Sequence, residues 1–162
     1  MTAVSEFRVE KTRTPAVVAL SNGATVAGFF FVSGSSATHL GPERVADVLN
    51  AEEGFFPFEV EEAGAVRTVL LNRAQVRTVA LEGHDEPRRD PGYEVATERT
   101  VSMLLSDGRR VAGTVRVYRP QGRDRLSDWA RAPETFRYLE TADGTLIVNV
   151  AHIIEVFEST PS

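Results

Sequence analysis

One nine-residue motif occurs twice in this chain and constrains its fold more than any other feature. Residues 20–28 read LSNGATVAG, and residues 105–113 read LSDGRRVAG. In both copies a turn glycine, Gly23 or Gly108, follows an apolar run and precedes another, a strong hairpin signal. We expect a type I′ turn at Asn22-Gly23, because both residues tolerate positive φ. The motif therefore predicts a strand-rich chain with an internal duplication.

Each copy carries a second glycine, five residues after the first. Gly28 and Gly113 fall inside the expected return strands, at residues 24–32 and 111–118. A glycine inside a strand marks a bend or the close approach of another backbone. We therefore expect both strands to bend at these positions.

The correspondence between the two halves continues beyond the hairpin. Helices expected at residues 42–51 and 126–131 share an Arg-aliphatic-x-Asp element, and a phenylalanine follows each arginine by eleven residues. The shared order of these positions predicts a duplication. Its members are Arg44 with Arg125, Asp47 with Asp128, Phe55 with Phe136, and Asn72 with Asn149. We interpret the arginine and aspartate pairs as local ion pairs or helix caps.

The apolar patterns predict a mainly β chain of two tandem small barrels. Each barrel has about five strands and one short inserted helix, and the two form a pseudo-dimer. The first repeat covers residues 1–82, the linker 83–92 and the second repeat 93–162. The linker is rich in proline, glycine and charge and lacks apolar periodicity. The strands expected in the first half cover residues 7–13, 16–20, 24–32, 55–61, 66–72 and 76–81; those in the second cover 95–105, 111–118 and three closing segments up to residue 158.

Composition limits the classes of function. The chain of 162 residues has no cysteine, which excludes disulfides and thiolate chemistry, and its net charge of -5 argues against a surface that attracts phosphate everywhere. Its apolar runs are all shorter than the roughly 20 residues that span a bilayer, and the first residues lack the apolar core of a signal peptide. We expect a cytoplasmic protein without membrane contact.

No catalytic constellation stands out. The Gly-x4-Gly spacing in GATVAG lacks the lysine of a phosphate loop and lies in a strand. His39, His84 and His152 lack metal-site spacing, and we interpret His84-Asp85-Glu86 as a solvated linker segment. The serine-rich loop that starts at Ser33 lacks a nucleophile elbow. We therefore expect no enzyme activity, no cofactor and no metal.

The two copies differ most on the face of the return strand opposite the core. In the second half this face and the loop after it are basic, and arginines interleaved with an aromatic ring suit phosphates and bases. The equivalent face of the first half is aromatic, and two exposed phenylalanines would be costly. The basic set is Arg110, Arg116, Tyr118, Arg119 and Arg123; the aromatic pair is Phe29 and Phe31.

The repeated motif resembles the first motif of the Sm and LSm family of small five-stranded barrels. The pattern Leu-x-x-Gly-x-x-Val-x-Gly is matched by residues 20–28 and again by residues 105–113. Asn72-Arg73-Ala74 is similar to the second motif of that family, although alanine replaces its glycine. The resemblance implies a fold. The inserted helices replace the loop that carries the RNA-binding residues of the family, so RNA binding transfers to no residue.

Two functional hypotheses follow. The first is a non-enzymatic interaction or assembly module, with Phe29 and Phe31 as the contact surface and a homo-oligomer or another protein as partner. The alternative is RNA or nucleotide binding through the arginine-rich face of the second repeat.

Overall fold

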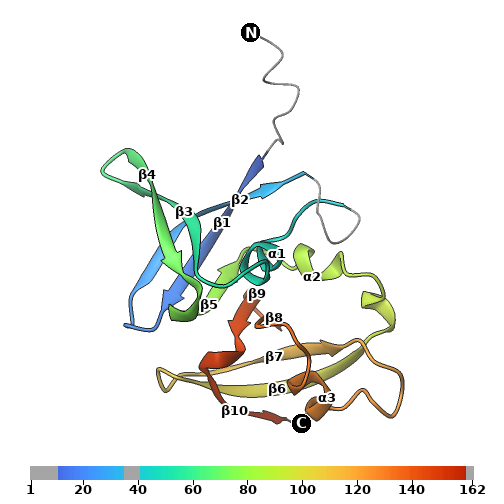
Figure 1. Cartoon of the computed structure of the whole chain (residues 1–162). Coiled ribbons are helices and arrows are strands. Elements are labelled where there is room, and N and C mark those ends of the chain that lie inside the picture. The colour runs from blue at the N-terminus through green and yellow to red at the C-terminus, as the bar shows by residue number, and fades with distance from the viewer. Residues whose placement is uncertain (1–10, 35–40, 160–162) are drawn as a thin grey trace.

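The structure is a computed structural model that describes residues 11–34 and 41–159. Ten strands form a single antiparallel sheet, accompanied by three short helices (Figure 1). The first half holds β1 (Lys11–Leu20), β2 (Thr25–Ser33), α1 (Val45–Asn50), β3 (Phe55–Glu62), β4 (Ala65–Asn72) and β5 (Val76–Leu81). The second holds β6 (Thr97–Leu105), β7 (Arg110–Val117), α3 (Leu126–Ala130), β8 (Phe136–Thr141), β9 (Gly144–Asn149) and β10 (Ile153–Glu158), and α2 (Asp85–Arg88) lies between the halves.

The strand order repeats from one half to the other. The sheet runs β10-β6-β7-β8-β9-β5-β1-β2-β3-β4, so each half contributes five strands in the same internal order. The halves meet where β5 pairs with β9. The strands β4 and β10 end the sheet, which therefore stays open. The mainly β prediction is confirmed, while the closure of each half into a barrel stays a prediction.

Most predicted elements match the observed ones, with three differences. A lead-in strand at residues 7–13 and a second strand at 16–20 were expected, but one strand, β1, begins at Lys11; residues 7–10 lie outside the described residues. Strand β5 pairs with β1 only from Ala16 onward, so Pro15 lies where one edge of β1 is free. Helix α1 begins at Val45, and the predicted linker contains α2.

The hairpin turns differ from the predicted type. The Gly23 N–H donates to the Leu20 carbonyl at 3.1 Å, and Gly23 has a φ of 88°, but Asn22 does not adopt positive φ. The type I′ prediction is therefore wrong, because a three-residue loop with a glycine in the left-handed region connects β1 to β2. The two-residue connection with positive φ at both positions lies between β3 and β4, at Ala63 and Gly64.

The glycines inside the return strands allow the next strand to approach closely. A Cβ atom at Gly28 would lie 2.1 Å from the Glu59 carbonyl oxygen, and one at Gly113 would lie 2.4 Å from that of Glu140. Each glycine is next to the only residue pair that joins its strand to the following one, Phe29 with Glu59 and Thr114 with Glu140. The close approach of the next backbone, one of the two roles expected of these glycines, is confirmed.

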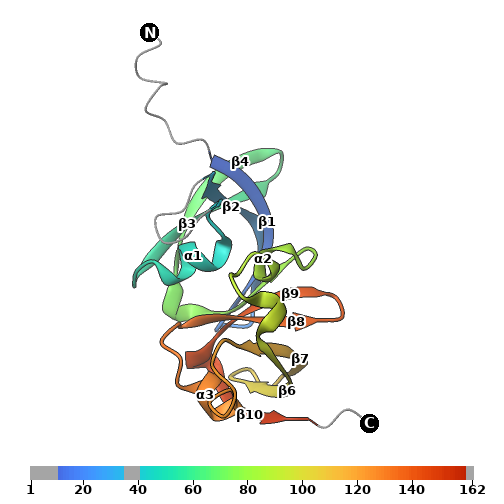
Figure 2. The same cartoon turned by 90° about the vertical axis from the view of Figure 1, so that its right-hand side faces the viewer.

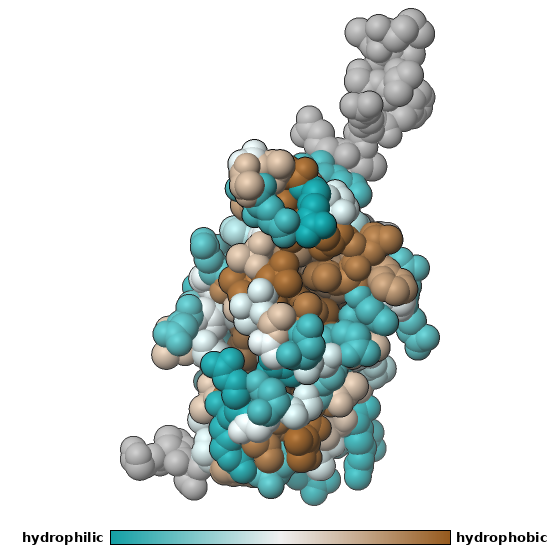
Figure 3. Space-filling view, turned by 90° about the vertical axis from the view of Figure 1, so that its left-hand side faces the viewer, coloured by the Kyte–Doolittle hydropathy of each residue, from teal (hydrophilic) through white to brown (hydrophobic). Residues whose placement is uncertain are grey.

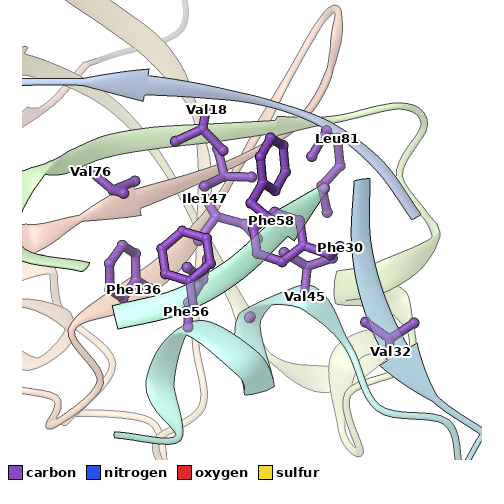
Figure 4. Packing of buried hydrophobic residues seen from close by; sticks show 14 of the residues in the cluster. Val18, Phe30, Val32, Val45, Phe56, Phe58, Val76, Leu81, Phe136 and Ile147 are labelled. Carbon is purple, nitrogen blue, oxygen red and sulfur yellow. The ribbon is translucent and has the colours of Figure 1, made fainter. Parts of the chain in front are cut away.

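Two hydrophobic clusters form the core, and the larger one draws on both halves. Phe30, Phe56 and Phe58 pack together in the first half, with ring centroids 5.4 and 5.1 Å from Phe30. Phe136 and Ile147 of the second half are buried in the same cluster. Figure 4 shows the Phe136 ring beside Phe56. The two halves therefore share one core at their junction.

The helices lie together on one side of the sheet (Figure 2). Helix α1 contacts β8 of the other half, and α3 contacts β7. An aspartate in the first turn caps each of α1 and α3. The Arg44 N–H donates to Asp47 at 2.8 Å, and the Arg125 N–H donates to Asp128 at 3.0 Å. The predicted capping role of these pairs is confirmed. Within the described residues, no helix has the length and apolar character needed to cross a membrane.

Candidate functional site

The junction between the halves is a continuous strand pairing. Residues Thr78 to Leu81 of β5 pair antiparallel with Val148 to Thr145 of β9. The Asn149 amide donates to the Val76 carbonyl at 2.9 Å and to the Arg73 carbonyl at 3.3 Å. Asn149 is 1% exposed. This side chain therefore ties the end of β9 to the start of β5.

Two more contacts hold the junction together. The Phe136 ring enters the core of the first half and is 3% exposed. The Asn50 side chain of α1 donates to the Phe136 carbonyl and accepts from its N–H, both at 2.9 Å. Asn50 thus pairs with the Phe136 backbone as a neighbouring strand would.

The equivalents of these junction residues are exposed at the β4 end of the sheet. In the first half Phe55 stands where Phe136 does, and Leu70 stands where Ile147 does. Phe55 is 59% exposed and Leu70 is 66% exposed, whereas Ile147 is fully buried. The Asn72 amide, equivalent to that of Asn149, has no acceptor among the described residues. Strand β4 pairs with β3 and thus carries the equivalents of the junction residues along an outer edge that pairs with no other strand.

The strand at the other end of the sheet, β10, also has a free edge. Strand β10 is equivalent to β5, and it pairs only with β6. Ile154 is 65% exposed and Phe157 is 45% exposed, while the β5 counterpart of Ile154, Arg77, is 3% exposed. The two surfaces lie at opposite ends of the molecule (Figure 1).

Exposed apolar side chains concentrate at these two ends. Five of the eight large hydrophobic side chains that are exposed among the described residues lie there. Figure 3 shows an apolar area on the side of the molecule where β4 lies. The five are Phe55, Val66, Leu70, Ile154 and Phe157.

Carboxylates neutralise part of the predicted basic face. Arg110 forms an ion pair with Glu155 at 2.9 Å, and Arg116 is paired with Glu98 at 2.5 Å and Glu140 at 3.2 Å. Burial and the Asp90 carboxylate raise the pKa of Tyr118, whose hydroxyl donates to Asp90 at 3.0 Å. The side chains of Arg119 and Arg123 have no partner among the described residues. The structure does not bring the five together as one free basic surface.

The predicted aromatic pair is half-buried. Phe29 and Phe31 both have intermediate exposure, and the Arg13 guanidinium lies 4.0 Å from the centre of the Phe29 ring. Arg13 also forms an ion pair with Glu61 at 3.2 Å. This arrangement covers part of the face that was predicted as a contact surface, and its role as an interface stays a prediction.

Two arginines that donate to backbone carbonyls, the buried Arg73 and the half-buried Arg137, were not anticipated from the sequence. Arg73 donates to the carbonyls of Val48, Leu49 and Phe55 at 2.9, 3.1 and 2.6 Å, and burial lowers its pKa. In the second half Arg137, which comes from a different strand position, donates to carbonyls after α3. Both satisfy the free carbonyls at a helix end. For Arg73, the sequence signal that could have identified it was its position in the Asn72-Arg73-Ala74 motif.

A cleft of about 770 Å³ opens between the halves on the side of the helices. Its walls contain paired polar groups. Arg44 contacts Asp90, and the Tyr138 hydroxyl donates to the buried Glu86 at 2.9 Å. Glu86 also accepts from the Ala46 N–H at 2.9 Å. The interpretation of Glu86 as solvated is therefore wrong, because its carboxylate links α2, α1 and β8.

The remaining sequence candidates form no reactive cluster in the described residues. His152 contacts the Ser106 hydroxyl and the Ala74 carbonyl, both at 2.8 Å, and so joins the halves. Among the described residues no three histidines, aspartates or glutamates gather as a metal site. His39 lies outside the described residues. No family model, curated protein or solved structure matches this chain.

Proposed function

We propose that this chain is a non-enzymatic assembly module of two Sm-like repeats that joins further copies of itself head to tail through β10 and β4. One observation carries the proposal: the surface that is buried where β5 meets β9 recurs, unpaired, at both ends of the sheet. An unpaired strand edge is a template for another strand. A second copy fits this edge because its own repeats already make the same contact.

The internal junction predicts the register of the contact between copies. Thr78 pairs with Val148, and Val79 pairs with Ile147. Transferred to the ends of the sheet, Glu155 of one copy pairs with Leu71 of the next, and Val156 pairs with Leu70. The two strands run antiparallel and extend the sheet from one copy into the next.

The side chains at the two ends complete the contact. By equivalence with Phe136, the Phe55 ring enters the second-half core of the neighbouring copy. By equivalence with Asn149, the Asn72 amide donates to the carbonyls of Val150 and Ile153. Burial of an exposed Phe55 or Leu70 contributes roughly 2 kcal/mol each.

The contact between copies is weaker than the internal junction. Arg131 stands where Asn50 does, so the two hydrogen bonds to the Phe136 backbone have no equivalent between copies. The internal junction also forms within one chain, without the entropy cost of association. Assembly therefore depends on protein concentration.

The contact is heterologous, because each copy uses two different surfaces. Such a contact builds a closed ring when the rotation between copies closes, and a filament when it does not. The two cases differ in mass: a ring stops at one size, and a filament grows with concentration.

Size-exclusion chromatography with light scattering tests the proposal. The head variant, Phe55→Lys with Leu70→Lys, and the tail variant, Ile154→Lys with Phe157→Lys, add the same charge at opposite ends. Each variant alone is expected to be a monomer, and their mixture a 1:1 dimer, because each retains the surface that the other lacks. Val17→Lys with Val95→Lys is the matched control, since both residues are exposed away from the two edges.

Several results would contradict the proposal. If the wild type were a monomer at every concentration, the proposed assembly would be contradicted. If the head variant alone formed a dimer, the contact would instead join β10 to β10. Loss of assembly in Phe31→Arg with no effect in the head and tail variants would instead favour the Phe29 and Phe31 face.

A further inference from the structure

The cleft between the halves carries side chains that the repeated fold does not require. At the position of α3 that faces the cleft, the second half has a tryptophan where the first has a valine. The two positions directly after β7 also gain a ring and a charge relative to the first half. The pairs are Trp129 with Val48, Tyr118 with Ser33, and Arg119 with Gly34.

Most polar groups in the walls of the cleft are already satisfied. Arg44 is occupied by Asp90 and Asp47. Arg137 uses all three guanidinium nitrogens on backbone carbonyls, and its charge lies beside Glu134. These groups hold the walls in place.

Two donors in the cleft walls remain without an acceptor among the described residues. One is the Trp129 indole N–H, whose side chain is only 7% exposed and whose ring is stacked against Arg137. The other is the exposed guanidinium of Arg119. Apolar and aromatic residues such as Val117, Phe136 and Pro133 line the cleft together with charged side chains. No buried side-chain nitrogen or oxygen among the described residues lacks a partner, so the indole N–H is open to solvent, and an acceptor on a ligand would replace water there.

We propose that this cleft binds a planar aromatic anion. The flat body of the ligand packs between α3 and β8, a ring atom or carbonyl accepts from the Trp129 indole, and the anionic group pairs with Arg119. Pockets of this size, apolar with a few converging polar groups, are typical of small-ligand sites. Both aromatic carboxylates and nucleoside monophosphates have this chemistry.

The single tryptophan of the chain makes the test direct. A ¹H–¹⁵N spectrum of the full chain contains one indole cross-peak, so Trp129 needs no assignment. We expect 2-naphthoate to shift this peak in a saturable titration, and the neutral 2-naphthamide to bind about tenfold more weakly, because a charge-assisted hydrogen bond is lost. The Arg119→Gln variant removes the preference for the anion. Arg109→Gln, an arginine without a side-chain partner outside the cleft, retains it.

The outcomes separate clearly. Equal binding of the acid and the amide, an unmoved indole peak, or an equal effect of the two arginine variants overturns the proposal. Competition by AMP against 2-naphthoate assigns the site to nucleotides, and absence of competition assigns it to aromatic carboxylates; both results support an aromatic-anion site. The head variant with its blocked β4 edge is expected to bind equally, which separates this site from the proposed assembly.

Discussion

At the scale of single residues, two glycines determine how tightly neighbouring strands pack. A side chain at Gly28 would overlap the Glu59 carbonyl and the Phe58 ring, whose nearest atoms lie 2.1 and 2.7 Å from the Cβ position. The backbone cannot yield without breaking the pairing between β2 and β3, which rests on one residue pair. The Gly28→Ala variant is therefore expected to lower the free energy of unfolding by about 1–3 kcal/mol, as measured by urea denaturation.

Gly34→Ala is the matched control for this prediction. Gly34 has open space around its Cβ position and no positive φ. The same substitution there is expected to leave stability unchanged within about 0.5 kcal/mol. Equal effects of the two variants would show that the close approach at Gly28 carries no stability.

The three tyrosines make stability depend on alkaline pH. Burial and the Glu86 carboxylate raise the pKa of Tyr138, and burial with a nearby carboxylate raises those of Tyr93 and Tyr118. An acid whose pKa is raised by folding stabilises the folded state below its unfolded pKa. That contribution is lost as pH rises above about 10.

We therefore expect the free energy of unfolding to fall between pH 9 and pH 11. Tyr138→Phe should reduce this fall, because phenylalanine cannot ionise. Urea denaturation at several pH values measures both slopes. An unchanged slope in Tyr138→Phe would show that Tyr138 does not carry the linkage.

At the scale of elements, β4 and β9 carry the same asparagine in two environments. An aspartate at either position retains the oxygen that accepts from the following loop and removes the amide donors. Asn149→Asp places a carboxylate against two carbonyls of the buried junction and is expected to lower the free energy of unfolding by several kcal/mol. Asn72→Asp is expected to leave stability unchanged and to weaken self-association about tenfold.

Urea denaturation and sedimentation at several concentrations measure these two effects. The head-to-tail contact would be contradicted if Asn72→Asp associated as strongly as the wild type. The equivalence of the two strands would be contradicted if Asn149→Asp retained full stability.

At the scale of the whole molecule, the shared core couples the two halves. Phe136 belongs to the second half but is buried in the first-half cluster, whereas its equivalent, Phe55, is 59% exposed. Phe136→Ala is therefore expected to cost about 3–5 kcal/mol and Phe55→Ala less than 1 kcal/mol. Both variants are expected to retain a single unfolding transition, because the first-half cluster also contains Phe136 and Ile147 from the second half.

Thermal unfolding followed by Trp129 fluorescence and by far-ultraviolet circular dichroism measures this coupling. Trp129 reports on the second half, and circular dichroism on the whole sheet. Transitions that do not coincide would show that residues 1–82 and 93–162 fold independently.

The local sequence pattern predicted much of the fold, because secondary structure depends largely on residues that are neighbours in the chain. The alternation of apolar residues located most strands to within two residues, and the Arg44 and Arg125 elements located the helices. The hairpin type was wrong because Asn-Gly suits more than one loop geometry. Arg73 and Arg137 were missed because their partners are carbonyls brought near by folding, and the cleft because its walls come from both halves.

The sequence by itself determined the strand-rich class and the glycines where strands approach, since these follow from spacing and side-chain size. Only the tertiary structure decided which edges are used. Strands β4 and β9 have similar sequences, yet one is exposed and the other buried, because β5 has a single free edge and β9 occupies it. That choice is a matter of three-dimensional pairing, and it leaves β4 and β10 exposed at the two ends of the molecule.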